Sequence, residues 1–107
     1  MKFKLAPSAK NDVLEITDYY TNVSAPLAES FVTELETTLR ALCLQPGLGS
    51  RRYAHLLPNH SLRSWRLDRF PFLLFYRIDG VWLEVLRVLH ERRDISADLI
   101  GDAKKPD

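Results

Sequence analysis

The spacing of apolar residues changes at the Gln45-Pro46-Gly47 sequence, and this change limits the folds open to the chain. Before it, apolar residues recur every three or four positions, as on one face of a helix. One such stripe is formed by Ala28, Phe31, Leu35, Leu39 and Leu42. After it, the apolar runs are short and broken by turn residues, which is typical of strands. Since Pro and Gly stop helices, this helix is predicted to end at residues 45–47.

An earlier helix is predicted to begin at Pro7, because proline suits the first turn of a helix. Its apolar stripe is Ala9, Val13, Ile16 and Tyr20. The acidic residues of this helix are expected to face water: Asp12, Glu15 and Asp18. Ser24 is a predicted N-cap for the second helix, and Pro26 fits its first turn. Two amphipathic helices joined by so short a loop predict a helical hairpin.

Strand patterns flank this hairpin on both sides. The opening sequence KFKLA alternates and predicts a short strand with Phe3 and Leu5 facing inward. Three more strands are predicted over residues 61–67, 72–78 and 81–90, and a short helix over 94–100. Asp79-Gly80 is a strong hairpin signal, because glycine adopts a positive φ without steric cost. The order β-α-α-β-β-β predicts an α+β fold of two layers, with the helical hairpin packed on one face of an antiparallel sheet. We expect one domain over residues 1–100 and a flexible C-terminal tail over 101–107.

Charge is distributed unevenly along the 107 residues, although the net charge is only +1. Residues 11–45 hold six acidic side chains and a single basic one, Arg40. Residues 46–93 hold nine arginines, four acidic side chains and no lysine. The planar guanidinium group of arginine suits bidentate binding of carboxylates or phosphates. The C-terminal half is therefore suited to contact with an acidic partner.

Several classes of protein are excluded by composition. Cys43 is the one cysteine, so no intramolecular disulfide or cysteine-based zinc site is expected. The three histidines lack companions at ligand spacing, so no metal is expected either. A glycine-rich phosphate loop is missing from the sequence, and we expect no cofactor. No apolar run approaches the ~18 residues of a membrane span and no signal peptide is visible, which predicts a cytoplasmic protein without membrane contact.

Four segments follow the order and residue types of a known family: LAPSAKNDVLEI, LQPGLGSRR, LRSWRLDRFPFLLFYRID and VLRVLHERRD. In these segments the chain resembles the ParE branch of the ParE/RelE toxin superfamily of bacterial toxin–antitoxin systems. The resemblance covers residues 1–100, and the C-terminal motif is its most specific part. Ala6 departs from the family, which commonly has a capping threonine there, so the start of the first helix is expected to be less stable.

The resemblance implies the toxin of a type II toxin–antitoxin system, with a role in plasmid stabilisation. It implies a ParD-like antitoxin whose extended C-terminal segment wraps the toxin. It also implies that the freed toxin inhibits DNA gyrase, in which case nucleic acid is contacted only through gyrase or operator-bound antitoxin. RelE relatives instead cut mRNA on the ribosome, and this endoribonuclease activity is the alternative. A third possibility is a non-toxic member that represses its operon together with the antitoxin.

The nuclease alternative would use His90, Arg87 and Arg63. Histidine suits acid–base catalysis near neutral pH, and arginines stabilise phosphoryl charge. In the other interpretation, His90 forms a local hydrogen bond at a strand end and positions the following turn. RNA-cleaving relatives carry an arginine at the position that corresponds to Leu73, and they tend to have a tyrosine or further base in the C-terminal tail. Because Leu73 is aliphatic and no tyrosine follows Tyr76, we favour a protein-binding toxin with no catalytic residue.

Two arginine pairs are predicted to contact a partner. Arg92 and Arg93 follow the last strand, and Arg51 and Arg52 lie in the long loop. Either an acidic segment or a gyrase–DNA surface would be a suitable partner. Arg63 is a further candidate, although about half of the strand arginines are expected to pair with acidic residues of the chain, such as Asp68, Glu84 or Asp94.

The strands are apolar on both sides, which is unusual for a sheet that is wet on one face. Leu73 and Phe75 point away from the side to which Phe72, Leu74 and Tyr76 point. We therefore predict an apolar groove on the second face, covered by an antitoxin helix or strand. In an alternative that does not exclude the first, the terminal helix folds back over this face with Ile95, Leu99 and Ile100.

Overall fold

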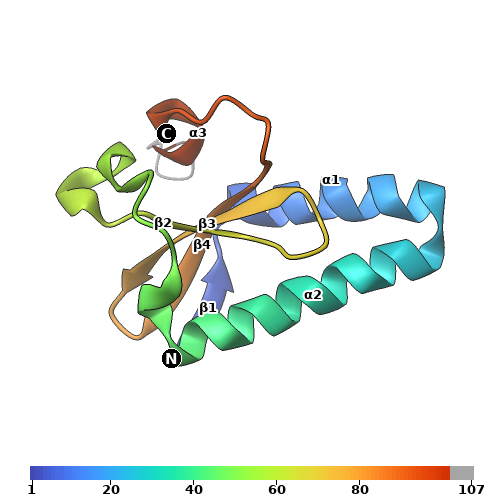
Figure 1. Cartoon of the computed structure of the whole chain (residues 1–107), viewed down its shortest axis with the longest axis horizontal. Helices are drawn as coiled ribbons and strands as arrows, with labels where there is room; N and C mark the ends of the chain where they lie inside the picture. Colours follow the sequence, from blue (N-terminus) through green and yellow to red (C-terminus); the bar gives the residue numbers. More distant parts are fainter. Residues whose placement is uncertain (102–107) are drawn as a thin grey trace.

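Two long helices lie side by side against one face of a sheet in the computed structural model, which describes residues 1–101 (Figure 1). The elements are β1 (Lys2–Leu5), α1 (Pro7–Val23), α2 (Ala25–Leu44), β2 (Arg63–Arg66), β3 (Phe72–Asp79), β4 (Trp82–His90) and α3 (Ala97–Gly101). Three short 3₁₀ turns lie between α2 and β2. The expected C-terminal tail lies outside the described residues, apart from Gly101 at the end of α3. The predicted α+β layering is confirmed.

The sheet has the strand order β1-β4-β3-β2. β2, β3 and β4 are antiparallel, and Gly80 has a φ of +62° in the β3–β4 turn, as the Asp-Gly signal predicted. β1 is parallel to β4, with Lys2 opposite Trp82, so the expectation of an antiparallel sheet is wrong at this edge. The alternation of apolar and charged residues in β1 predicts which face of the strand is buried. It does not predict which strand β1 pairs with. Its Phe3 is 38% exposed and only Leu5 packs against the core, which corrects the prediction for Phe3.

The helical hairpin forms where the periodicity placed it. All five residues of the α2 stripe are buried, and the α1 stripe packs against the same core. Burying a large apolar side chain contributes about 1.5–3 kcal/mol, so this stripe holds α2 on the sheet. The Ser24 hydroxyl accepts a hydrogen bond from the Leu27 amide at 3.2 Å, as predicted for an N-cap, whereas Ala6 gives α1 no such cap. No helix within residues 1–101 combines the length and apolar character needed to cross a membrane.

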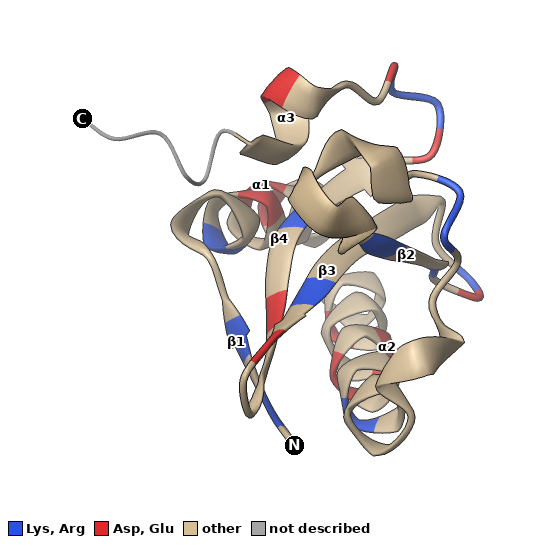
Figure 2. Cartoon of the chain, turned by 90° about the vertical axis from the view of Figure 1, so that its left-hand side faces the viewer, with Lys and Arg blue, Asp and Glu red and all other residues tan. Residues whose placement is uncertain are grey.

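Asp12 is only 7% exposed, so the prediction that it faces water is wrong. β1 ends at Leu5, and α1 then begins beside the part of β4 that β1 does not cover (Figure 2). The Asp12 carboxylate accepts a hydrogen bond from the Val88 amide at 2.9 Å and pairs with Arg87. A buried backbone N–H needs an acceptor, and Asp12 supplies it where the neighbouring strand has stopped.

A second core lies on the other face of the sheet. The register shifts between Phe75 and Tyr76, so that Leu86 of β4 has no residue opposite it. Such a bulge turns neighbouring side chains to one side. The second core comprises Ala6, Leu57, Leu62, Phe75, Leu86, Leu89 and Ile100. The prediction that the terminal helix folds back is confirmed, and Phe75 is fully buried beneath it, so the expectation that Phe75 lines an open groove is wrong for this structure.

Candidate functional site: an arginine-rich groove

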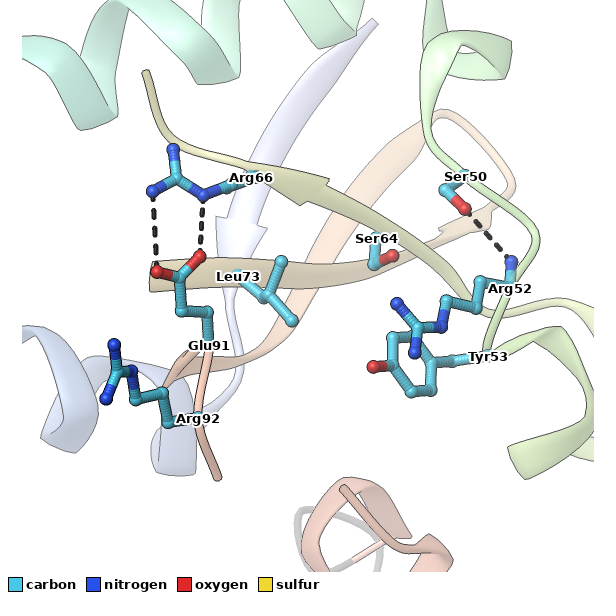
Figure 3. Close-up of a pocket in the computed structure, with 8 residues that line it drawn as sticks. All are labelled: Ser50, Arg52, Tyr53, Ser64, Arg66, Leu73, Glu91 and Arg92. Carbon is cyan, nitrogen blue, oxygen red and sulfur yellow. Dashed lines mark hydrogen bonds and ion pairs between the residues drawn. The ribbon is translucent and has the colours of Figure 1, made fainter. Parts of the chain in front are cut away.

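A groove of about 530 Å³ opens on the second face of the sheet, beside the second core (Figure 3). β2 and β3 supply Ser64, Arg66 and Leu73. One wall comes from the loop before β2, and the other from the turn after β4. The lining residues are Ser50, Arg52, Tyr53, Ser64, Arg66, Leu73, Glu91 and Arg92. Three arginines and one glutamate give this groove a net charge of +2.

Arg66 and Glu91 form an ion pair at one end of the groove. The Arg66 Nε lies 2.6 Å from Glu91 Oε1, and Arg66 Nη1 donates to the Leu67 carbonyl at 2.8 Å. The hydrogen bond from Arg66 lowers the pKa of Glu91, and the same bond raises the pKa of Arg66. Because the pair is exposed, its effect on stability is small. The Arg66 guanidinium therefore already binds acceptors of its own chain.

Arg52 is held at the opposite wall. Its backbone amide donates to the Ser50 hydroxyl at 3.0 Å, and its guanidinium lies 5.2 Å from the centre of the Tyr53 ring. This cation–π contact fixes the long side chain without removing its hydrogen-bond donors. The Tyr53 ring packs in turn on buried Phe75, with centroids 5.5 Å apart. The core therefore supports this wall.

Arg92 belongs to the turn that follows β4. Its amide donates to His90 Nδ1 at 3.1 Å, and the Arg93 amide donates to the His90 carbonyl at 2.9 Å. The expected local role of His90 in positioning the following turn is confirmed. The imidazole also stacks edge-on against Phe72, with centroids 5.4 Å apart. His90 thus fixes the turn from which Arg92 projects.

Tyr76 fixes the base of the loop that carries Arg52. Its hydroxyl donates to the Pro46 carbonyl at 2.7 Å and accepts from the Gly49 amide at 2.9 Å. Burial raises the pKa of this hydroxyl, and the hydrogen bond from Gly49 opposes the rise in part. Arg63 donates to the Gly49 and Gly47 carbonyls at 3.0 and 3.1 Å. The loop is thus tied to β2 and β3 just before the groove begins.

The three residues of the nuclease alternative are not brought together. Arg87 is 12% exposed, its Nε and Nη2 donate to Asp12 at 2.8 and 2.9 Å, and its Nη1 donates to the Leu99 carbonyl at 2.9 Å. Arg63 pairs with Tyr76 in the sheet, whereas His90 pairs with Phe72. Four positions along β3 separate these pairs by about 13 Å. Both arginines bind groups of their own chain.

The predicted partner contacts divide into two groups. Arg52, Arg92 and Leu73 line the groove. Arg51 donates to the His60 carbonyl at 3.1 Å, and Arg93 is exposed but outside the lining. The sequence reasoning missed the other lining residues, Ser50, Tyr53, Ser64, Arg66 and Glu91, of which only Arg66 and Glu91 carried a signal, as opposite charges at predicted strand ends. Within the part of the chain described, no three His, Cys, Asp or Glu side chains gather closely enough to hold a metal ion.

Comparison with known proteins identifies the family. The family model described as the ParE toxin of the type II toxin–antitoxin system parDE matches residues 3–95. Toxin ParE1 of Mycobacterium tuberculosis is 29% identical over 100 residues, which cover 92% of this chain and 97% of that protein. Toxin ParE1 of Caulobacter vibrioides is also 29% identical over 100 residues, with 91% and 96% covered. The solved chromosomal ParDE system from P. aeruginosa contains a chain with a TM-score of 0.68 and 25% identity, and the match covers 84% of this chain and 95% of that one. The chain therefore belongs to the ParE toxin family of type II toxin–antitoxin systems.

Proposed function

We propose that the chain is a toxin that acts in the cytoplasm by binding DNA gyrase, and that a ParD-like antitoxin neutralises it. The observation that carries this proposal is the match to the ParE toxin family over residues 3–95. The likeness to a chain of a solved ParDE system supports the antitoxin partner. Gyrase is the target that the resemblance of the sequence to this family implies.

The site favours binding over catalysis. Cleavage assisted by a ribose hydroxyl needs a base, an acid and charge stabilisation held together. Here Arg87 is paired with Asp12, Arg63 holds loop carbonyls, and Leu73 occupies the groove. A groove in which an apolar side chain is flanked by arginines is suited to binding the surface of another protein.

A supercoiling assay with purified gyrase and relaxed plasmid tests the target. Excess toxin is expected to block supercoiling, and toxin purified with its antitoxin is expected to leave it unchanged. Normal supercoiling in excess free toxin would contradict the gyrase proposal. A toxin should also arrest growth when expressed alone and be tolerated when the neighbouring upstream reading frame is expressed with it.

The ribosome-dependent endoribonuclease remains the second candidate, because Arg52, Arg92 and Tyr53 offer groups that contact phosphates and bases. Translating ribosomes supplied with the purified chain distinguish the two. Under our proposal the transcripts stay intact, and His90→Ala leaves growth arrest in place. Cleavage that depends on His90 would establish the nuclease instead. A chain that neither arrests growth nor cuts RNA, but strengthens operator binding by the antitoxin, would be the co-repressor.

A further inference from the structure

A second pocket, of about 450 Å³, lies between α1, the start of β3 and the end of β4. Four aromatic rings and one carboxylate contribute to its lining: Tyr19, Tyr20, Phe72, His90 and Glu15. Phe72 and His90 are paired across β3 and β4 and lie on the face of the sheet that the helical hairpin covers. Leu73 of the arginine-rich groove points to the other face, because side chains alternate along a strand. This aromatic pocket is therefore separate from the arginine-rich groove.

Helical spacing brings the carboxylate next to one of the rings. Glu15 and Tyr19 are four residues apart on α1, so their side chains are neighbours on one face of the helix. Tyr19 is 66% exposed and packs edge-on against Tyr20, with ring centroids 5.4 Å apart. Tyr20 and His90 each pack edge-on against Phe72, with centroids 6.4 and 5.4 Å apart. None of these pairs is stacked face to face, which leaves ring faces for a ligand.

The charge of the aromatic pocket is negative. Glu15 has no cationic side chain within ion-pair distance among residues 1–101. It accepts a hydrogen bond from the Asn11 side chain at 3.3 Å, and a carboxylate can accept about four such bonds, so most of its capacity remains. Asp18 is exposed three residues further along α1 and adds a second negative charge nearby. His90 Nδ1 accepts from the Arg92 amide, so this nitrogen carries no proton and the imidazole is neutral.

Aromatic ring faces beside a carboxylate recognise a cation, because the ring faces carry the negative part of the quadrupole. Arginine fits this combination better than lysine. Its planar guanidinium stacks on aromatic rings, and its N–H groups bind a carboxylate in bidentate fashion. Bases also stack on aromatic rings, but Glu15 and Asp18 would repel the phosphates of a nucleic acid.

We propose that the aromatic pocket binds the guanidinium group of an arginine presented by a partner protein. The Glu15 carboxylate accepts its hydrogen bonds, and the rings of Tyr19 and Tyr20 provide the surface on which it stacks. The inference goes beyond the proposed function, because it assigns a second binding site on the opposite face of the sheet and depends on neither gyrase nor the antitoxin.

Amide chemical shifts of the full chain, titrated with a capped glycine–arginine–glycine peptide, test this assignment. The amides of Glu15, Tyr19 and Phe72 are expected to shift in a saturable manner. The same peptide with citrulline, a neutral analogue of similar shape, should bind at least fivefold more weakly. Glu15→Gln should weaken binding of the arginine peptide about fivefold, because it removes the counter-charge of an exposed ion pair. Tyr19→Leu should weaken it about threefold, because it keeps apolar surface but removes a ring.

Asp79→Asn is the matched control for charge. Asp79 is exposed in the β3–β4 turn, at the end of β3 opposite to Phe72 and about 23 Å from it. Asn-Gly is as suitable for this turn as Asp-Gly, so the control should fold normally and leave affinity unchanged. Because Glu15 and Tyr19 are exposed, their variants are also expected to fold, and the dispersion of the spectra verifies this.

Three outcomes would overturn the assignment. The first is equal affinity for the arginine and citrulline peptides, and the second is affinity that neither Glu15→Gln nor Tyr19→Leu changes. The third is tighter binding of a lysine peptide, a glutamate peptide or a single-stranded RNA trinucleotide at the same amides.

Discussion

Replacing Asp12 by alanine is expected to lower the free energy of unfolding by about 3–5 kcal/mol. The Asp12 carboxylate accepts three hydrogen bonds, from Arg87 Nε at 2.8 Å, Arg87 Nη2 at 2.9 Å and the Val88 amide at 2.9 Å. These contacts join α1 to β4 at a site where both side chains are about nine-tenths buried. Alanine would remove the carboxylate that pairs with the buried Arg87 guanidinium and would leave the Val88 amide without its acceptor.

The size of this loss decides whether the chain remains folded. Domains of this length have unfolding free energies of roughly 5–15 kcal/mol, so the substitution removes a large fraction of the total. Replacing both partners, as in Asp12→Leu with Arg87→Met, should recover only part of the loss, because apolar residues of similar volume often substitute for a buried ion pair but the Val88 amide still lacks its acceptor.

Urea denaturation followed by tryptophan fluorescence measures these differences, and a double-mutant cycle gives the coupling energy of the pair. Asp18→Ala is the matched control on the exposed side of the same helix, and it should change stability by no more than about 0.5 kcal/mol. The reasoning is refuted if Asp12→Ala costs less than about 1 kcal/mol, or if the double variant is no more stable than the single one.

Three further substitutions test local features by the same denaturation assay. Gly49→Ala should cost about 1–3 kcal/mol, since a Cβ there would come within 2.8 Å of Tyr76 ring carbons, whereas Gly47→Ala meets nothing within 4 Å and serves as its control. Tyr76→Phe removes two hydrogen bonds and should cost about 1–3 kcal/mol. Burial raises the pKa of Tyr76 in the folded state. The stability that its neutral hydroxyl provides should therefore be complete below pH 10 and be lost as the pH rises through the folded-state pKa. A comparison of the alkaline unfolding of the wild-type chain with that of Tyr76→Phe measures this loss. Ser24→Ala should lower the free energy of unfolding by about 1 kcal/mol through loss of the α2 N-cap. An unchanged urea concentration at the midpoint of unfolding would contradict that role.

Local patterns predicted the parts of the fold that depend on neighbouring residues in the chain. The stripe on α2 follows from helical spacing alone, and the β3–β4 hairpin follows from the conformational freedom of Gly80. The opposite facing of Leu73 and Phe72 follows from strand alternation. In each case the deciding interaction lies within a few residues.

Contacts between distant segments were the ones that sequence reasoning missed. Asp12 occupies a polar position in the α1 pattern, and nothing near it reveals that Val88, 76 residues later, presents an unpaired amide. The burial of Phe75 likewise depends on a helix that ends the described chain. The groove was predicted in part, because exposed arginines are visible in a sequence. Its serines and Tyr53 were missed, because their positions depend on how the loop packs on β3.

The pairing of β1 with β4 sets an order of events during synthesis. Lys2 is the first residue of the sheet to leave the ribosome, but its neighbour Trp82 is among the last. Helices form locally and fast, whereas a pairing across most of the chain must wait until the loop between its ends can close. The nascent chain consequently cannot complete its sheet, or the Asp12–Arg87 pair beside it, until β4 has emerged. Any surface that depends on the completed sheet, the groove included, forms only after that pairing.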